Sequence, residues 1–382
     1  MKLFEYETKN ILRKYGIPTP KGGLATNRSE AEEVATKLKP PFVVKAQVLV
    51  AGRGKAGGIL FANSVEEAEK TAEKLLNMQI KSIPVKSVWI EEKLQIKKEL
   101  YFGITTDRFN QSYVAIASEF GGIEIEEIAA KTPEKVVMFY INPQKGLRSF
   151  HTRQIARTMG YAGCQILELG KILERFYAAS MDYDVELIEM NPLVETIDGK
   201  FVAADARIIL DDSALFRHPE YKKRLLEDES ELTSQELEAL KSDLAYVKLD
   251  GNIGVIGNGA GLVMATLDTI QHYGGKPANF LDVGGGAPAE KIATALKIVL
   301  SDPNVDTLFI NILGGITRCD EVARGILEAK EEVGVTKPMV IRLVGTNEEE
   351  GKTILTKAGI HMLESMEEAA QRAVEISKHG GK

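Results

Sequence analysis

The sequence predicts an α+β region over residues 1–240, followed by an α/β domain with a doubly wound parallel sheet over residues 245–382. Three observations support this fold class. A chain of 382 residues with 44% apolar composition can bury the cores of two or three domains. Residues 1–210 mix helical patterns with strands that alternate polar and apolar side chains. From Ile253 onward, short apolar runs, glycine turns and amphipathic helices recur in five successive units.

The N-terminal region begins with an amphipathic helical pattern over residues 1–16. Further helices are expected near residues 30–38, 65–77 and 152–180, and strands at Val88–Glu92, Glu99–Thr105, Tyr113–Ser118, Val185–Glu189 and Lys200–Ala204. Alternation along these strands is typical of antiparallel sheets that are covered on one face. Residues 218–244 are dense in charge and have helical spacing, so we expect a helical connector there, with the domain boundary near residue 240.

The C-terminal units each begin with an apolar run that predicts a buried strand. The expected strands are Ile253–Ile256, Ala278–Val283, Val305–Leu313, Pro338–Val344 and Ile360–Leu363. Little alternation occurs within these runs, as expected for a parallel sheet covered on both faces by helices. The last helix is expected to end near His379.

The composition excludes several classes of protein. A formal net charge of −7 argues against general binding to nucleic acid or to an anionic membrane. No apolar run approaches the ~18 residues of a membrane-spanning helix. The two cysteines, Cys164 and Cys319, are far apart, which fits a reducing compartment and predicts a cytoplasmic protein. The five histidines lack metal-ligand spacing, and none lies in a catalytic setting.

A glycine-rich turn predicts a nucleotide-phosphate site. Gly52, Gly54 and Gly57 match the spacing of a dinucleotide fingerprint, but an apolar extended run, Ile59–Ala62, follows them in place of a helix. The context therefore favours a hairpin whose turn folds as a flap over phosphates. Glycine allows backbone amides to approach a polyanion, and Lys45 and Arg53 add positive charge nearby.

Two further sets of polar residues lie at strand ends. Glu91 and Glu99 flank a short link between strands, where they accept hydrogen bonds from a ribose or are simply solvated surface acids; the residues alone leave both interpretations open. Glu189 and Asn191 end one strand, and Asp205 ends the next, joined by a turn at Asp198-Gly199. Oxygen ligands on neighbouring strands suit Mg²⁺, which completes its octahedron with water and phosphate oxygens.

Three glycine turns, Gly257–Gly261, Gly284–Gly286 and Gly314–Ile316, follow successive strands of the C-terminal domain. Ligands of doubly wound sheets bind at this end of the strands, where helix N-termini attract anions. With Asn258 and Thr317 as additional donors, the turns predict an anion pocket.

The chain as a whole resembles the β subunits of the succinate–CoA ligase (succinyl-CoA synthetase) family. The resemblance rests on LFEYETKNILRKYGIPTP, VVKAQ with GRGKAGG, KKELYFGI, GGIEIEEIA, LIEMNPLV, ALFRHPE, LDGNIG with NGAGL, NFLDVGGGA and NILGGITRCD. It implies an ATP-grasp fold in the N-terminal half and a flavodoxin-like domain in the C-terminal half. A departure from the family pattern occurs after Asp205, where Ala206 and Arg207 replace a common Gly-Lys pair.

The resemblance implies roles for individual residues. The implied nucleotide contacts are Lys45, Gly52, Arg53, Gly54, Glu91, Leu94 and Glu99, and the implied Mg²⁺ ligands are Asn191 and Asp205. The implied succinate and phosphate contacts are Asn258, Gly315, Ile316 and Thr317. Glu189 matches a catalytic glutamate that faces a phosphohistidine, and Pro20 matches a residue typical of adenine-nucleotide (ADP-forming) members.

The implied reaction is that of the tricarboxylic acid cycle enzyme, succinyl-CoA + Pi + ADP ⇌ succinate + CoA + ATP. The family's phosphohistidine and most of its CoA site belong to a separate α subunit, which agrees with the absence of a histidine in a catalytic setting here. Both αβ and α₂β₂ assemblies are compatible with the sequence. The alternatives are a related subunit of malate–CoA ligase or ADP-forming acetate–CoA ligase, or a non-catalytic nucleotide-binding regulator.

Overall fold

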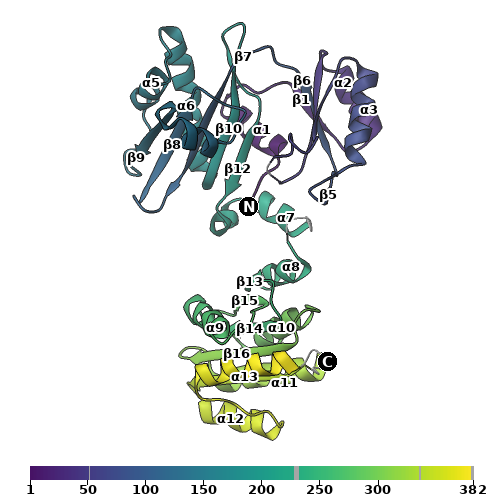
Figure 1. Cartoon of the computed structure of the whole chain (residues 1–382), viewed down its shortest axis with the longest axis vertical. Helices are drawn as coiled ribbons and strands as arrows, with labels where there is room; N and C mark the ends of the chain where they lie inside the picture. The colour runs from purple at the N-terminus through teal and green to yellow at the C-terminus, as the bar shows by residue number, and fades with distance from the viewer. Residues whose placement is uncertain (51, 228–231, 335–336, 380–382) are drawn as a thin grey trace. The chain divides into compact units, whose positions relative to one another are not determined.

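The computed structural model describes residues 1–50, 52–227, 232–334 and 337–379. The chain forms two compact units, Met1–Lys222 and Lys223–Lys382, and each is described by itself (Figure 1). Among the described residues, the structure contains no helix that is both long and apolar enough to cross a membrane.

The first sheet of the N-terminal unit carries the predicted flap. Its antiparallel strands are, in spatial order, β1 (Gly22–Ala25), β6 (Val88–Glu92), β2 (Phe42–Ala46) and β3 (Ile59–Ala62). Helices α2 (Arg28–Thr36) and α3 (Val65–Leu76) lie along one side of this sheet in Figure 1. The Asn27 and Ser64 side chains cap the two helices by accepting from backbone amides three residues later.

The hairpin prediction is confirmed. Strands β2 and β3 pair antiparallel from Phe42 opposite Ala62 to Lys45 opposite Ile59, and the glycine-rich turn joins them. The chain therefore does not enter a helix directly after the turn, as a dinucleotide fingerprint requires.

The second sheet of this unit follows the order β11-β10-β7-β8-β9, and β12 also pairs with β10. The bounds are β7 (Ile96–Asp107), β8 (Ser112–Ser118), β9 (Val136–Ile141), β10 (Val185–Thr196), β11 (Phe201–Ala203) and β12 (Ala206–Leu210). The turn between β10 and β11 lies at Asp198-Gly199, as predicted, with Gly199 at φ 84°. All pairings in the sheet are antiparallel, which confirms the α+β class.

Shorter elements complete the N-terminal unit. They are α1 (Glu5–Lys14), the two-residue strands β4 (Gln79–Ile80) and β5 (Ile83–Pro84), α4 (Ile125–Lys131), and the 3₁₀ turns Pro133–Lys135 and Asp212–Arg217. The single helix predicted at 152–180 is wrong: the structure has two, α5 (Ser149–Thr158) and α6 (Cys164–Asp182). The break contains Gly160 at φ 86°, just after α5 ends, and Gly163 at φ 62°, just before α6 begins, and glycine adopts such positive φ values readily.

The predicted connector is helical where it is described. It contains α7 (Pro219–Glu227) and α8 (Ser234–Lys241), and residues 228–231 lie outside the described residues. Thr233 and Glu236 form a reciprocal capping box at the start of α8.

The C-terminal unit contains one five-stranded sheet in the order β13-β15-β14-β16-β17. Its strands are β13 (Ala245–Lys248), β14 (Ile253–Gly257), β15 (Asn279–Asp282), β16 (Thr307–Gly314) and β17 (Met339–Gly345). Its other helices are α9 (Ala260–His272), α10 (Ala289–Leu300), α11 (Cys319–Val333), α12 (Glu348–Lys357) and α13 (Met366–His379). The four strands β14–β17 pair in parallel, as predicted.

The sheet differs from the prediction at both edges. Strand β13 pairs antiparallel with β15; it belongs to no predicted unit, and its exposed and half-buried residues alternate as on an edge strand. The strand predicted at Ile360–Leu363 is reduced to an isolated bridge between Met362 and Ile341. This run is only four residues long and contains the exposed His361, too little apolar surface to extend the sheet.

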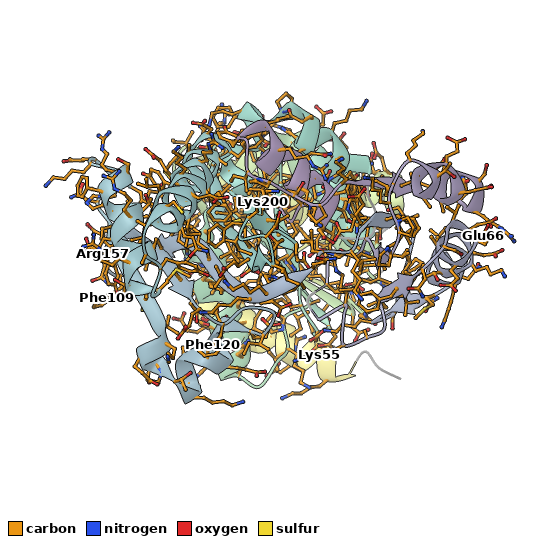
Figure 2. The ribbon with its side chains drawn as sticks, turned by 90° about the horizontal axis from the view of Figure 1, so that it is seen from above. Lys55, Glu66, Phe109, Phe120, Arg157 and Lys200 are labelled. Atoms are coloured by element: carbon orange, nitrogen blue, oxygen red, sulfur yellow. The ribbon has the colours of Figure 1, made fainter. Side chains whose placement is uncertain are left out.

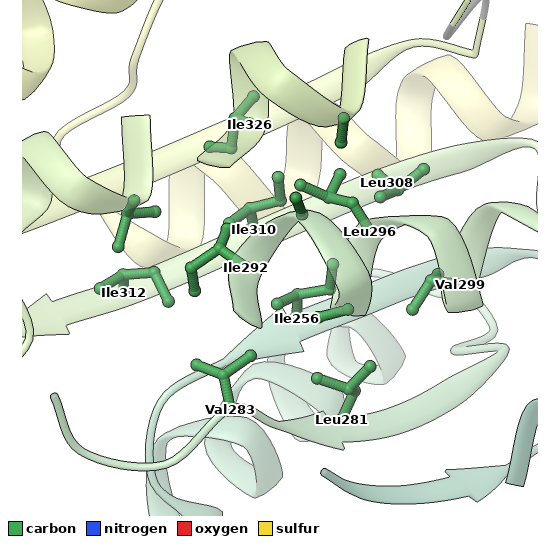
Figure 3. Packing of buried hydrophobic residues seen from close by; sticks show 14 of the residues in the cluster. Ile256, Leu281, Val283, Ile292, Leu296, Val299, Leu308, Ile310, Ile312 and Ile326 are labelled. Atoms are coloured by element: carbon green, nitrogen blue, oxygen red, sulfur yellow. The ribbon is translucent and has the colours of Figure 1, made fainter. Parts of the chain in front are cut away.

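The core of the C-terminal unit lies on both faces of the sheet, as the doubly wound prediction requires. On one face Ile256, Leu281 and Ile310 pack against Ile292 and Leu296 of α10 (Figure 3). On the other face, residues of α9 and α13 pack against the same strands. This packing fixes the carboxyl ends of β14, β15 and β16, which lead into the three glycine turns.

Candidate nucleotide site

A buried network of charges lies beneath the flap. Lys45, on β2, is 6% exposed, and its Nζ lies 2.9 Å from Glu5 Oε1 and 2.8 Å from Glu91 Oε1. The same Nζ donates to the carbonyl oxygen of Ala204 at 2.8 Å. The Lys45 ammonium group is thus surrounded by three acceptors, and these bonds offset the free-energy cost of burying its charge.

Arg53 reaches this network from the glycine-rich turn. Its guanidinium bonds to Glu5, lies 3.0 Å from Asp205 Oδ2, and donates to the Ala46 carbonyl at 3.2 Å. Lys45 and Arg53 therefore share the carboxylate of Glu5. The structure thus brings together the two cations that the sequence predicts to bind phosphate. Lys55, the other cation of the turn, is exposed (Figure 2).

Three residues of the network were not identified from the sequence: Glu5, Lys9 and Trp89. Lys9 is fully buried, 2.6 Å from Glu5 and 2.5 Å from Glu91. The indole of Trp89 donates to Glu91 Oε2 at 2.8 Å. Glu91 is therefore bound by three donors and is 2% exposed, which excludes the interpretation of Glu91 as a solvated surface acid.

The electrostatics of the network are balanced. Burial would raise the pKa of the Glu5 carboxyl, but Arg53, Lys45 and Lys9 hold this pKa well below its ordinary value. Burial would likewise lower the pKa of Lys45, but Glu5 and Glu91 raise it above its ordinary value. Three cations thus face the three carboxylates of Glu5, Glu91 and Asp205.

The turn itself uses part of its backbone for its own closure. The amides of Ala56, Gly57 and Gly58 donate to carbonyls of the turn, and Gly52 has φ 73°. These hydrogen bonds hold the turn in shape.

The predicted metal ligands lie side by side. Asn191 is on β10, and Asp205 is in the break between β11 and β12. The backbone N–H of Asn191 donates to the backbone carbonyl of Asp205 at 3.0 Å. The Asn191 side chain accepts from the Gly122 amide at 2.7 Å and donates to the Ile123 carbonyl at 3.0 Å. No group of three or more His, Cys, Asp or Glu that could hold a metal occurs in the described part of the chain.

The donor set nonetheless fits Mg²⁺. An amide oxygen and a carboxylate are hard oxygen ligands, and Mg²⁺ takes one or two protein side chains when phosphates and water supply the rest. The Asp205 side chain is 29% exposed, and both of its carboxylate oxygens accept from Arg53, at 3.1 and 3.0 Å.

Glu189 lies in a separate, smaller cluster. The Tyr101 hydroxyl donates to Glu189 Oε2 at 3.1 Å, and Arg207 lies 3.6 Å from Oε1. Burial raises the pKa of the Glu189 carboxyl above its ordinary value, against the opposing effect of Arg207. Arg207, noted above as a departure from the family pattern, is therefore a counter-ion of Glu189.

The remaining predicted nucleotide contacts lie around the same strands. Pro20 is buried, and its carbonyl accepts from Arg13, whose guanidinium lies 5.4 Å from the ring centroid of Trp89. Leu94 is half-buried in the link between β6 and β7. Glu99 contacts Gly122, where an added Cβ would lie 2.5 Å from the Glu99 carboxylate.

In the C-terminal unit, neutral hydrogen bonds hold the glycine turns together. The Thr317 hydroxyl accepts from the Gly286 amide at 2.9 Å and from the Asn258 side chain at 3.3 Å. Asn258 also exchanges hydrogen bonds with the backbone of Leu313 at 2.9 Å in each direction. Thr317 is buried, whereas Ile316 is 85% exposed.

Asp282 is a residue of this region that the site predictions missed. Its carboxylate accepts from the amides of Gly259 at 2.6 Å and Gly284 at 2.7 Å, so these amides are already bonded to an anion of the chain. The Thr346 hydroxyl donates to the Gly315 carbonyl, and this bond holds the Gly314–Ile316 turn in place through its backbone.

One sequence signal could have identified Glu5 and Lys9. They are four residues apart on the helical face that carries the buried Leu12, and so they stand where apolar residues are expected. Charges in an apolar stripe predict a buried ion pair. Asp282 offered no comparable signal, because an acid at a strand end is ordinarily exposed.

Comparisons with known proteins agree with this architecture. Residues 2–195 match the ATP-grasp domain family, and residues 256–376 match the CoA-ligase family. The chain is 48% identical over 381 residues to the β subunit of the ADP-forming succinate–CoA ligase of Pyrobaculum calidifontis, covering 99% of this chain and 100% of that one. It is also 48% identical, over 375 residues and 98% of both chains, to the β subunit of the GDP-forming enzyme of Thermus thermophilus.

A solved structure supports the fold over the whole length. ATP citrate lyase from Methanothrix soehngenii superimposes with a TM-score of 0.76 at 20% identity, covering 98% of this chain and 99% of that chain. The full-length identity to β subunits and the matches to both domain families lead to one conclusion. The chain belongs to the succinate–CoA ligase β-subunit family, with an ATP-grasp N-terminal region and a CoA-ligase C-terminal domain.

Proposed function

We propose that the chain works with an α subunit to catalyse succinyl-CoA + Pi + ADP ⇌ succinate + CoA + ATP, and that it binds the nucleotide. The observation that carries this proposal is the pairing of Lys45 on β2 with Arg53 of the flap around one buried carboxylate. Phosphoryl transfer depends mainly on positioning and on neutralising phosphate charge, which such a pair supplies.

The nucleotide would lie between the flap and the second sheet. Lys45 and Arg53, with the Gly52–Gly54 backbone, would bind phosphate oxygens. Leu94 and Glu99 would contact the ribose and base, whereas Glu91, which is 2% exposed and bound by three donors, would hold Lys45 in place beside them. The contact chain from Pro20 through Arg13 and Trp89 to Glu91 gives Pro20 a route to influence nucleotide choice, in favour of ADP.

Mg²⁺ would be held by Asn191 and Asp205 together with phosphate oxygens. When bound, the ion neutralises charge on the phosphates that are transferred. Asp205 would then exchange its pairing with Arg53 for the metal, and Arg53 would turn to the phosphates.

Glu189 would act near the phosphohistidine that the α subunit supplies. The Tyr101 hydroxyl contacts one of its oxygens and the Arg207 guanidinium faces the other, and burial raises the pKa of the Glu189 carboxyl above its ordinary value. In the C-terminal domain, Asn258 and the Gly315–Ile316–Thr317 turn would form this subunit's part of the succinate and phosphate site. CoA would bind mainly to the α subunit, and we expect the assembly in the cytoplasm.

The test is to co-express the chain with its α subunit and to assay a substrate panel. We expect succinyl-CoA cleavage that depends on phosphate and Mg²⁺ and is faster with ADP than with GDP. Higher turnover with malate or acetate as the acid would favour a related acyl-CoA ligase. Nucleotide binding without any ligase turnover would favour a non-catalytic regulator.

A further inference from the structure

Glu5 is a buried carboxylate to which the proposed reaction gives no task. It lies in the first turn of α1, is 5% exposed, and contacts Lys9 at 2.6 Å, Lys45 at 2.9 Å and the guanidinium of Arg53. Two of these three cations are the proposed phosphate contacts. Glu5 thus occupies, on the protein side, the position of an anion that bridges Lys45 and Arg53.

The bonds of Glu5 compete with those of a phosphate. The same Arg53 nitrogen that bonds to Glu5 also bonds to Asp205, and the other guanidinium nitrogen donates to the Ala46 carbonyl. Because Nη2 takes part in both forked faces of a guanidinium, Arg53 can bind a phosphate in bidentate fashion only when Nη2 loses its bond to Glu5 or to Asp205. Bidentate binding by arginine requires its donors in one plane to be free together.

An anion at this position also has a positive effect. Two cations held close together in a buried site repel each other and lose hydration, and a carboxylate between them offsets both costs. Lys45 and Arg53 therefore stay in place before the nucleotide arrives, and little reorganisation is needed when it binds.

We infer that Glu5 is a positioning residue that stands in for the nucleotide phosphate: it keeps Lys45 and Arg53 together in the empty site and competes with the phosphate for Arg53. The inference rests on the proposed nucleotide site. The lowered pKa of the Glu5 carboxyl supports the inference, because three neighbouring cations keep Glu5 ionised.

This role differs from a purely structural one in the sign of its effect. Loss of a purely structural residue weakens the binding of every ligand at the site. Loss of a competing anion strengthens phosphate binding, because the site gains net positive charge, while it slows turnover, because the cations are no longer held in the geometry of the transition state.

The experiment compares Glu5→Gln with Lys9→Met in the complete α–β complex. Lys9 belongs to the same network, is also buried and contacts Glu5, but its ion pairs in the described network go to Glu5 and Glu91 and not to Arg53. Calorimetry with ADP and Mg²⁺ measures affinity, and steady-state assays give KM and kcat. Glu5→Asp keeps the charge but shortens its reach and serves as the variant that folds most easily.

We expect Glu5→Gln to bind ADP about three- to tenfold more tightly than the wild type, with a lower kcat. Glu5→Asp should shift both quantities in the same directions by less. Lys9→Met should weaken ADP binding, because it removes a positive charge.

Equal or weaker ADP binding by both Glu5 variants, with the wild type binding normally, overturns the inference and leaves the proposed function intact. Absence of ADP binding by the wild-type complex overturns both. If Glu5→Gln does not fold, the Glu5→Asp result decides alone by the same criterion.

Discussion

The two units bring polar groups together by different physical means. In the N-terminal unit, side-chain charges from α1, β2, the flap and β6 meet in a buried network in which every cation has a carboxylate partner. In the C-terminal unit, loops are joined by a threonine hydroxyl, an asparagine amide and glycine amides. The N-terminal network is built from ion pairs, whereas the C-terminal turns are held by the Asp282 carboxylate and by neutral side-chain and backbone groups.

This difference predicts which substitutions each site tolerates. Removing one partner from a buried ion network leaves an uncompensated charge, which is costly because the interior solvates it poorly. Removing one hydroxyl from a neutral loop network leaves unsatisfied donors, at a smaller cost. The effects should therefore be large in the N-terminal unit and moderate in the C-terminal unit.

The largest effect is expected from Lys45→Met. It leaves Glu5 and Glu91 short of a partner and should lower the free energy of unfolding by about 3–5 kcal/mol. Affinity for ADP should fall about 10- to 100-fold, because a charge-assisted phosphate contact is lost. Chemical denaturation and calorimetry measure the two quantities. Lys74→Met, on the exposed side of α3, is the control, and a similar loss in that variant would contradict the assignment.

A moderate effect is expected from Thr317→Val, which keeps the shape of the side chain but leaves the Gly286 amide and the Asn258 side chain without their acceptor. The free energy of unfolding should fall by about 1–3 kcal/mol. The KM for succinate and phosphate should rise, while ADP affinity stays unchanged. The control is Thr294→Val, an exposed hydroxyl that donates only to its own helix. Weakened ADP binding in Thr317→Val would contradict the prediction that the two units bind different ligands.

The smallest effect is expected at acidic pH. Hydrogen bonding by Arg318, against a smaller effect of burial, lowers the pKa of Asp320 from 3.8 to about 2. A carboxyl whose pKa is lower in the folded state stabilises the fold above its unfolded pKa and loses that contribution as pH falls towards 2. Because Arg318 is half-exposed, the contribution should be about 1–2 kcal/mol.

Unfolding free energies measured between pH 6 and pH 2 test this prediction. Asp320→Asn should lose stability at pH 6 and show a flatter decline towards pH 2. Asp268→Asn, on the exposed face of α9, should follow the wild-type curve. A parallel decline in Asp320→Asn and the wild type would show that the buried aspartate is not the source.

Much of the fold and part of the site were predictable because they depend on local patterns. The glycine spacing and the apolar runs on either side predicted the flap hairpin, and the turn at Asp198-Gly199 brought Asn191 near Asp205. The βα units of the C-terminal domain followed from the same kind of pattern.

What was missed depends on tertiary contacts. Glu5 and Lys9 lie in the apolar stripe of α1, but glutamate and lysine four residues apart are ordinarily a solvent-exposed helical pair, and the pattern does not identify their partners Lys45 and Glu91. Strand β9 was not predicted for a related reason. It is an edge strand that, among the described strands, pairs only with β8, and its apolar residues Met138 and Tyr140 are about half exposed. Its sequence therefore lacks the alternation of apolar and polar residues that predicts a strand.

The placement of Lys45 and Arg53 has a kinetic consequence. Lys45 is fixed in the sheet by pairing with Ile59 and Trp89 on its two neighbouring strands, whereas Arg53 belongs to the turn. Any lifting of the turn breaks the bonds of Arg53 and leaves those of Lys45 in place. In the proposed site, the strand would set how strongly an anion is attracted and the turn would set how fast the anion leaves. Because affinity is the ratio of the two rate constants, a change in the turn sequence would alter residence time and affinity together.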